Sequence, residues 1–107
     1  NDNMVKLRGV NVFPEAIGAT LVTDARSNGE YFCFVDRVGE ARVDEMDVWV
    51  EVLDAVDRAA FRADFESRLK EVLGVRVAVT PVGKGELDRY TGTSLSSKVK
   101  RLLDRRG

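Results

Sequence analysis

Two groups of polar side chains, near opposite ends of the chain, are the candidates for chemistry. The group near the N-terminus consists of Asp2, Arg8, Gly9 and Asn11. The group near the C-terminus follows a hydroxyl-rich stretch and consists of Lys98, Lys100 and Arg101. A lysine ammonium on a loop-like segment is a compact charge that binds phosphate or carboxylate oxygens. The second group therefore indicates an anionic ligand.

The charge of the chain is unevenly distributed along its length. Residues 82–107 carry seven basic and three acidic side chains, a balance of +4. Because the whole chain has a net charge of −1, the residues before position 82 carry −5. This basic C-terminal segment on an otherwise acidic chain favours binding of an anion by the segment. A solvated terminal helix is the plainer interpretation.

Several common catalytic sites are missing from the sequence. The chain has no histidine and one cysteine, Cys33, which excludes a disulfide framework, a histidine-activated nucleophile and most zinc sites. The run VGKGE at 82–86 is too short for a phosphate-binding loop or a dinucleotide fingerprint. The carboxylates are scattered, so the chain by itself does not indicate a self-sufficient catalyst.

The length of 107 residues suits one domain with one modest core. No apolar stretch reaches the roughly 20 residues that span a bilayer, so we expect no membrane association. The lone Cys33 and the lack of a visible signal peptide favour a reduced, cytoplasmic setting. We expect Cys33 itself to be a small, buried apolar residue within a strand.

The N-terminal segment predicts a tightly specified turn ahead of a helix. Met4–Leu7 is expected to be a short strand that turns at Arg8-Gly9, because glycine tolerates backbone angles closed to other residues. Val10–Phe13 is expected to be extended up to Pro14, which suits the first position of a helix. Turn residues at 27–29 then end this helical unit.

The centre of the chain predicts a hairpin followed by a long helix. The aromatic run Tyr31–Arg37 and the alternating run Asp47–Val52 indicate two strands, which we expect to pair antiparallel. Trp49 falls on the polar face of the second strand, where we expect another element to cover it. Asp57–Leu73 is typical of an amphipathic helix that stops at Gly74. The apolar stripe of this helix consists of Phe61, Phe65, Leu69, Val72 and Leu73.

The last third of the chain predicts a strand, a loop and a basic helix. Val75–Thr80 alternates like a strand, and Pro81 is expected to stop it. Residues 83–93 are polar and contain glycine, which indicates a mobile loop. Ser94–Arg105 predicts a short, strongly basic helix.

Together these elements predict an α+β fold for residues 1–107 as a single domain. We expect a two-layer sandwich in which helices pack on one face of a small mixed or antiparallel sheet, in a ferredoxin-like arrangement. A short N-terminal β piece would precede this sandwich.

The run DNMVKLRGVNVFPEAI, residues 2–17, resembles the opening of the C-terminal domain of adenylate-forming enzymes. The likeness is greatest to phenylacetate–CoA ligases and their relatives, and RGVNVFP is its specific part. VDR at 35–37, DVWVEV at 47–52 and KVKRLLDRR at 98–106 fit the same domain in the same order. The resemblance covers essentially the whole chain and implies the mobile C-terminal domain of a larger ligase.

The resemblance implies a role for each residue of the N-terminal group. Asp2 matches the acidic hinge residue about which the small domain rotates between two half-reactions. Arg8, Gly9 and Asn11 match the loop that swings into the active site for thioester formation and helps to line the pantetheine channel.

For the C-terminal group the resemblance implies a role in adenylation. Lys98 matches the catalytic lysine that contacts the carboxylate and α-phosphate oxygens in the other orientation of the domain. Ser97 stands where the family usually has a glycine, so Lys100 competes for this role. Lys100 and Arg101 are further candidates for residues near the phosphates.

The implied reaction uses ATP, Mg²⁺, CoA and an aryl or other carboxylic acid in the full-length enzyme. The acid and ATP would form an acyl-adenylate and pyrophosphate, and CoA would then give the thioester and AMP. The resemblance places ATP and the acid on the enzyme's own N-terminal domain, which is not in this sequence. We therefore expect this domain to be inactive alone, with no ligand or metal bound.

Two other functions remain open on the sequence. One is a stand-alone regulatory module that binds a small molecule on a ferredoxin-like fold. The other is nucleic-acid binding by the basic tail, which we do not expect. Sheet-based RNA readers need exposed aromatic residues beside basic ones, whereas here Asp36 and an acidic neighbouring strand accompany the aromatic strand.

Overall fold

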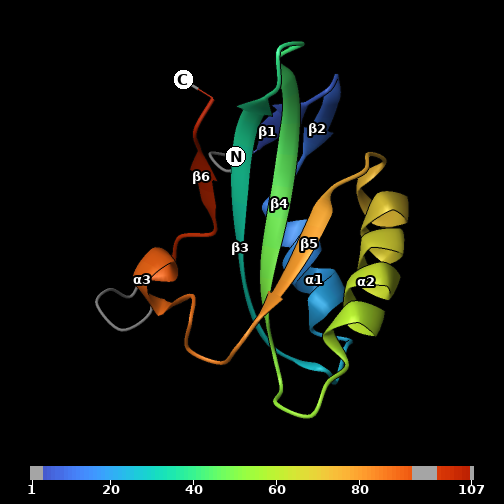
Figure 1. The fold of residues 1–107 in the computed structure, drawn as a ribbon, viewed down its shortest axis with the longest axis vertical. Coiled ribbons are helices and arrows are strands. Elements are labelled where there is room, and N and C mark those ends of the chain that lie inside the picture. Colours follow the sequence, from blue (N-terminus) through green and yellow to red (C-terminus); the bar gives the residue numbers. More distant parts are fainter. Residues whose placement is uncertain (1–3, 93–98, 107) are drawn as a thin grey trace.

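The computed structural model of the chain describes residues 4–92 and 99–106. Nine elements follow one another in these ranges (Figure 1). They are β1 (Val5–Leu7), β2 (Val10–Val12), α1 (Pro14–Leu21), β3 (Ser27–Val38), β4 (Val43–Val52), α2 (Arg58–Leu73), β5 (Ala78–Val82), α3 (Asp88–Thr91) and β6 (Leu102–Asp104). Of the helices described, none has the length and apolar character needed to cross a bilayer.

A four-stranded mixed sheet with the order β5-β4-β3-β6 forms the centre of the molecule. β3 and β4 pair antiparallel, as the alternating patterns predict, while β5 and β6 each run parallel to their neighbour. β1 and β2 form a separate two-stranded antiparallel sheet. Figure 1 shows this small hairpin beside one end of the long β3–β4 pair.

The main core lies between the sheet and the two longer helices. Val48, Val50 and Val52 are fully buried on the face of β4 predicted from the alternation. α2 covers this face with a stripe in which the rings of Phe61 and Phe65 stack at 5.2 Å. Burying each ring stabilises the fold by about 1.5–3 kcal/mol. Val72 was wrongly placed in this stripe, because its side chain is exposed.

The ends of α2 follow the local sequence closely. The Asp57 side chain accepts a hydrogen bond from the amide of Ala60 at 3.1 Å and so caps the first turn. Gly74 ends the helix with φ of 78°, a left-handed conformation that glycine adopts without steric cost.

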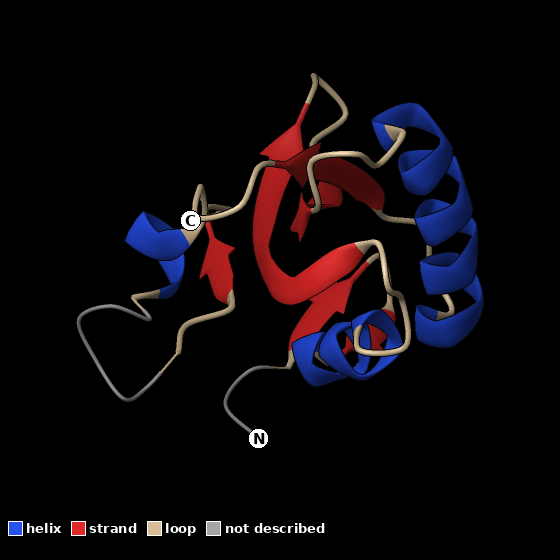
Figure 2. Cartoon of the chain, turned by 90° about the horizontal axis from the view of Figure 1, so that it is seen from below, coloured by secondary structure: helices blue, strands red, loops and turns tan. Residues whose placement is uncertain are grey.

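The opposite face of the sheet carries a second, aromatic cluster. Figure 2 shows the short helix α3 on the other side of the sheet from α2. Residues 83–91 bring Leu87 and Tyr90 onto Phe32, Phe34 and Trp49. Trp49 is thus covered by another element, as predicted. The prediction of a loop over 83–93 is wrong at 88–91, which form α3 because apolar contacts order this segment.

The predicted C-terminal helix over 94–105 is wrong for the part that the structure describes. Leu102–Asp104 form strand β6, parallel to β3. The amide of Cys33 donates to the carbonyl of Arg101 at 2.8 Å, and the amide of Arg105 donates to the carbonyl of Val35 at 2.7 Å. The open edge of β3 thereby gains a ladder of hydrogen bonds that a helix would leave unmade.

Several predicted strand boundaries also differ from the structure, including those of β5 and β3. β5 begins at Ala78 and continues through Pro81 to Val82, although proline lacks an amide donor. β5 is an outer strand of the sheet, and such a strand tolerates proline because one of its sides has no hydrogen-bond ladder to interrupt. Residues 27–29 form the start of β3 and not a separate turn, with a register shift before Tyr31. The α+β fold class is confirmed.

Candidate functional site

The Arg8-Gly9 corner is a two-residue turn between β1 and β2, as predicted. Leu7 and Val10 pair directly across it. Both corner residues have positive φ, 48° for Arg8 and 84° for Gly9, which matches the twist of a tight hairpin. A side chain added at Gly9 would meet no atom of the described chain within 4 Å. The corner therefore presents bare backbone on its open side.

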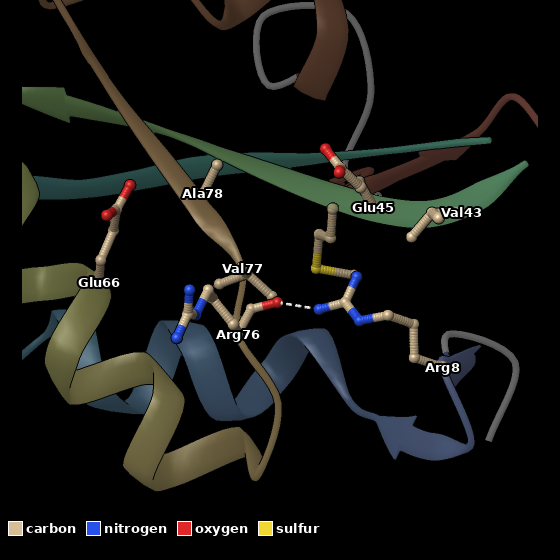
Figure 3. Close-up of a pocket in the computed structure, with 8 residues that line it drawn as sticks. Arg8, Val43, Glu45, Glu66, Arg76, Val77 and Ala78 are labelled. Atoms are coloured by element: carbon tan, nitrogen blue, oxygen red, sulfur yellow. Dashed lines mark hydrogen bonds between the residues drawn. The ribbon is translucent and has the colours of Figure 1, made fainter. Parts of the chain in front are cut away.

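The Arg8 side chain crosses from this corner to the body of the domain. Its guanidinium donates one hydrogen bond to the backbone carbonyl of Asp44. It donates a second to the backbone carbonyl of Arg76 (Figure 3). Asp44 lies in β4, and Arg76 lies just before β5. Arg8 therefore ties the hairpin to two separate segments. The remaining N-terminal candidate, Asn11, lies exposed in β2 opposite Lys6.

A pocket of about 460 Å³ lies beside the Arg8 side chain. Figure 3 shows the Arg8 side chain extending from the end of the hairpin toward Arg76, whose carbonyl accepts one of its hydrogen bonds. The lining of the pocket combines acidic, basic and apolar side chains. Its lining residues are Arg8, Val43, Glu45, Met46, Glu66, Arg76, Val77 and Ala78.

The carboxylate of Asp44 joins two further arginines at the same place. Oδ1 accepts from Nε of Arg37 at 2.7 Å, and Oδ2 accepts from Nη1 of Arg106 at 2.9 Å. The hydrogen bond from Arg37, aided by that from Arg106, lowers the pKa of the Asp44 carboxyl. The same Nη1 of Arg106 donates to the carbonyl of Lys6 in β1 at 2.8 Å. Asp44 thus contacts both arginines that hold the hairpin.

Sequence reasoning missed Asp44, because the second strand of the hairpin was expected only from Asp47 onward. β4 begins four residues earlier, at Val43, and places Asp44 directly opposite Arg37. An oppositely charged cross-strand pair was therefore a usable signal once the hairpin had been extended. No local pattern indicates the contact with Arg106, which is 62 residues away.

Lys100 and Arg101 have different environments although they are neighbours. The Lys100 side chain is exposed, while its amide donates to the carbonyl of Thr91 at 2.9 Å. The Arg101 guanidinium lies 4.5 Å from the centre of the Tyr31 ring and donates to Glu30 Oε1 at 3.1 Å and to the Tyr31 carbonyl at 3.0 Å. Arg101 is therefore engaged in fixing the chain at the start of β6.

The two candidate groups do not converge in the part of the chain that the structure describes. Arg8 reaches the segment that leads into β5, whereas Lys100 and Arg101 lead into β6. β5 and β6 are the two outer strands of the sheet. Asp2 and Lys98, the predicted hinge and catalytic residues, lie outside the described ranges.

A buried carboxylate that the sequence did not single out fixes the segment ahead of α3. Glu51 is almost fully buried in β4. Its Oε1 accepts from Nδ2 of Asn28 at 2.8 Å, and its Oε2 accepts from the amide of Leu87 at 3.0 Å. Burial acts to raise the pKa of Glu51, but hydrogen bonds from Asn28 and from the backbone of Gly85 and Leu87 outweigh it, and the pKa is lowered. Glu51 therefore remains charged and pins this segment to the sheet.

Metal-ligating side chains do not cluster in residues 4–92 and 99–106. These ranges contain no group of three or more histidine, cysteine, aspartate or glutamate side chains that could hold a metal ion. Cys33 is fully buried, as predicted, and burial raises the pKa of its thiol to about 12. A thiol in that state is a poor ligand and a poor nucleophile.

Residues 9–106 match the family described as "AMP-binding enzyme C-terminal domain". Comparison with curated protein sequences gives no significant match. Among solved structures, the chain is similar to a domain of phenylacetate-coenzyme A ligase from Bacteroides vulgatus ATCC 8482. The TM-score is 0.80 with 26% sequence identity, over 99% of this chain and 95% of that one.

The chain is also similar to one part of 2-hydroxyisobutyryl-CoA ligase. The structure of that ligase with 2-HIB-AMP and CoA in the thioesterification state gives a TM-score of 0.80 at 30% identity, over 97% of this chain. Its postadenylation state with R3-HIB-AMP gives 0.73 at 29% identity, over 98% of this chain. The chain spans only 21–22% of the length of these ligase chains.

Proposed function

Because the chain belongs to the AMP-binding enzyme C-terminal domain family, we propose that it is the mobile C-terminal domain of an ATP-dependent acid–CoA ligase. The observation that carries this proposal is the likeness to 2-hydroxyisobutyryl-CoA ligase in complex with CoA, at 30% identity over 97% of the chain. Since the chain spans about a fifth of that ligase, a larger N-terminal domain would complete the enzyme.

The proposed reaction has two steps. The carboxylate of the acid attacks the α-phosphorus of ATP, which forms an acyl-adenylate and releases pyrophosphate. The thiol of CoA then attacks the acyl carbon, which forms the thioester and releases AMP. The likeness to a phenylacetate-coenzyme A ligase domain favours an aryl acid such as phenylacetate.

We assign the Arg8-Gly9 corner to the second step. The open side of Gly9 leaves room for a thin, thiol-bearing arm to pass close to the backbone. The donors of Arg8 are directed at two backbone carbonyls, so Arg8 acts by holding the corner in place. Asn11, exposed on the adjoining strand, supplies a polar side chain near the same opening.

We assign Lys98 to the first step. Adenylation brings a carboxylate against a polyphosphate, so a positioned ammonium there stabilises the transition state by about 3 kcal/mol. On a domain that rotates about Asp2, the ammonium would be withdrawn once the acyl-adenylate has formed. Lys100 remains the competitor, since its side chain is exposed. The contacts of Arg101 with Glu30 and Tyr31 support an anchoring role for that residue.

ATP and CoA are substrates in this proposal, and Mg²⁺ would accompany the nucleotide. The described residues do not fit a metal site, since their acidic side chains do not cluster.

The proposal is tested with the full-length protein that contains this chain. Acid-dependent exchange of pyrophosphate into ATP measures adenylation, and acyl-CoA formation measures the complete reaction. We expect both activities with a set of acids that includes phenylacetate and 2-hydroxyisobutyrate. A protein that catalyses neither exchange nor thioester formation with any carboxylic acid in the set would rule out the proposed function.

A further inference from the structure

We propose that Asp44 is a positioning residue for thioester formation, which sets the orientation of the Arg8-Gly9 corner. This inference rests on the proposed function of the corner. Asp44 lies in β4, away from the bare backbone at Gly9, and acts through the arginines that it contacts. The resemblance assigns no role to this residue.

The need for such a residue follows from the size of the hairpin. β1 and β2 are three residues long each, and their two-stranded sheet is separate from the four-stranded sheet. A two-stranded hairpin of this size has little stability of its own. Val5, Leu7 and Val12 bury their side chains in the main core and so fix one side of it. The corner at the far end depends on side-chain contacts.

Those contacts meet at Asp44. Its backbone carbonyl accepts from Arg8, which belongs to the corner. Its carboxylate accepts from Arg106, which also donates to the carbonyl of Lys6 in β1. Main chain and side chain of one residue therefore hold the hairpin at two points, one in the turn and one in the preceding strand.

The charges explain why a carboxylate is required at this position. Three guanidinium groups, those of Arg8, Arg37 and Arg106, make hydrogen bonds to Asp44. Asp104 offsets one of these charges, with Oδ2 at 2.7 Å from Nη2 of Arg106. Loss of the Asp44 carboxylate would leave Arg37 without an ion pair in the described chain and weaken the hold of Arg106 on β1. The corner would then sample other orientations.

A merely structural role for Asp44 predicts a different result, because a general loss of stability affects both half-reactions alike. The chain offers a matched control in Asp36, which lies in β3 and forms a two-point bridge with Arg105 at 2.7 and 2.8 Å. This second arginine–carboxylate pair also joins the C-terminal residues to the sheet. The side-chain hydrogen bonds of this pair join Arg105 to Asp36 in β3 and involve neither β1 nor β2.

The test compares Asp44→Ala with Asp36→Ala in the full-length protein, and each half-reaction is measured separately. We expect Asp44→Ala to slow thioester formation from supplied acyl-adenylate by roughly tenfold to a hundredfold. Adenylation should change by less than about twofold, and Asp36→Ala should leave both rates within about twofold. Equal losses in both half-reactions, or equal effects of the two variants, would overturn the proposal.

Hydrogen–deuterium exchange of the peptide covering 5–13, in the same proteins, gives a readout that does not depend on activity. Asp44→Ala should speed exchange in this peptide, while Asp36→Ala should not. Should Asp44→Ala fail to fold, Asp44→Asn keeps one acceptor oxygen and should show the same pattern more weakly. Unchanged exchange in a folded Asp44 variant contradicts the inference.

A wild-type protein without ligase activity counts against the proposed function. The exchange data then still decide whether Asp44 orders the corner.

Discussion

The guanidinium of Arg106 donates to the backbone carbonyl of Lys6 at 2.8 Å and so joins residues that are 100 positions apart. The same side chain is only 17% exposed and also pairs with Asp44 and Asp104. One arginine near the C-terminus therefore helps to hold the first strand of the domain in place.

This relationship predicts that Arg106 and its neighbour Arg105 contribute unequally to stability. Arg106→Ala should lower the free energy of unfolding by about 1–2 kcal/mol, because it removes several charged hydrogen bonds. Arg105→Ala should cost less than about 1 kcal/mol, since Arg105 is 49% exposed and its ion pair with Asp36 lies at the surface, beside a contact with the Phe34 ring. Urea unfolding of the two variants measures the difference. Equal losses of unfolding free energy in the two variants would show that the hydrogen bond from Arg106 to Lys6 does not contribute to stability.

Gly9 is expected to matter for the CoA step because of what its missing side chain leaves open. Gly9→Asn keeps a residue that tolerates positive φ but adds a side chain to the open face. It should slow thioester formation by roughly tenfold or more while sparing adenylation. The matched control is Gly39→Asn, at another open turn with φ of 73°. If both half-reactions of the Gly9 variant proceed at the wild-type rate, the corner does not line the path of CoA.

Lys98→Ala in the full-length enzyme should slow adenylation by about a hundredfold, because the variant lacks the ammonium that stabilises the transition state. Thioester formation from supplied acyl-adenylate should continue at its normal rate. Lys100→Ala serves as the neighbouring control and should leave adenylation nearly unchanged. The opposite pattern in the two variants would transfer the role to Lys100.

Acid should destabilise the domain through its paired carboxylates, of which Asp24 is the clearest case. Hydrogen bonds from Arg26, with a smaller effect of Arg68, hold the pKa of Asp24 below its ordinary value of 3.8. Because the unfolded chain binds the proton more tightly, the stabilisation is complete above about pH 5 and is lost as the pH falls through the lowered pKa. Unfolding free energies measured from about pH 5 down to pH 2 should therefore fall, and less steeply in Asp24→Asn.

A control for this pH dependence is available in Asp54→Asn. Asp54 is exposed and makes no ion pair in the described ranges. Asp54→Asn thus removes a carboxylate without removing an ion pair in these ranges, and its slope of stability against pH is the reference for Asp24→Asn. If unfolding free energy depends on pH equally steeply in wild type and in Asp24→Asn, the ion pairs of Asp24 contribute no measurable stability.

Much of the fold could be predicted because it depends on neighbours in sequence. The Arg8-Gly9 turn, the start of α1 at Pro14 and the end of α2 at Gly74 each follow from local backbone preferences. The pairing of β3 with β4 follows from alternating patterns that bury one face of each strand. The family resemblance was carried by residues in these same local features.

The segments that were wrongly predicted take their structure from distant partners. Residues 102–104 belong to the run Ser94–Arg105, which was predicted as a basic helix, but the free edge of β3 offers them hydrogen bonds along a strand. Residues 88–91 look like part of a loop, yet the aromatic face of β3 and β4 orders them as α3. Propensity is a weak guide wherever partners far along the chain supply the decisive contacts.

The corner, the family motif and the residue types available for chemistry follow from short runs of the sequence. The contacts that hold the corner arise only in the folded chain. Arg8, Arg37 and Arg106 lie far apart in the chain and meet at Asp44 because the sheet, the hairpin and β6 bring them together. The physical reason is that ion pairs and hydrogen bonds depend on distance in space, which the folded core sets and the spacing of residues along the chain does not.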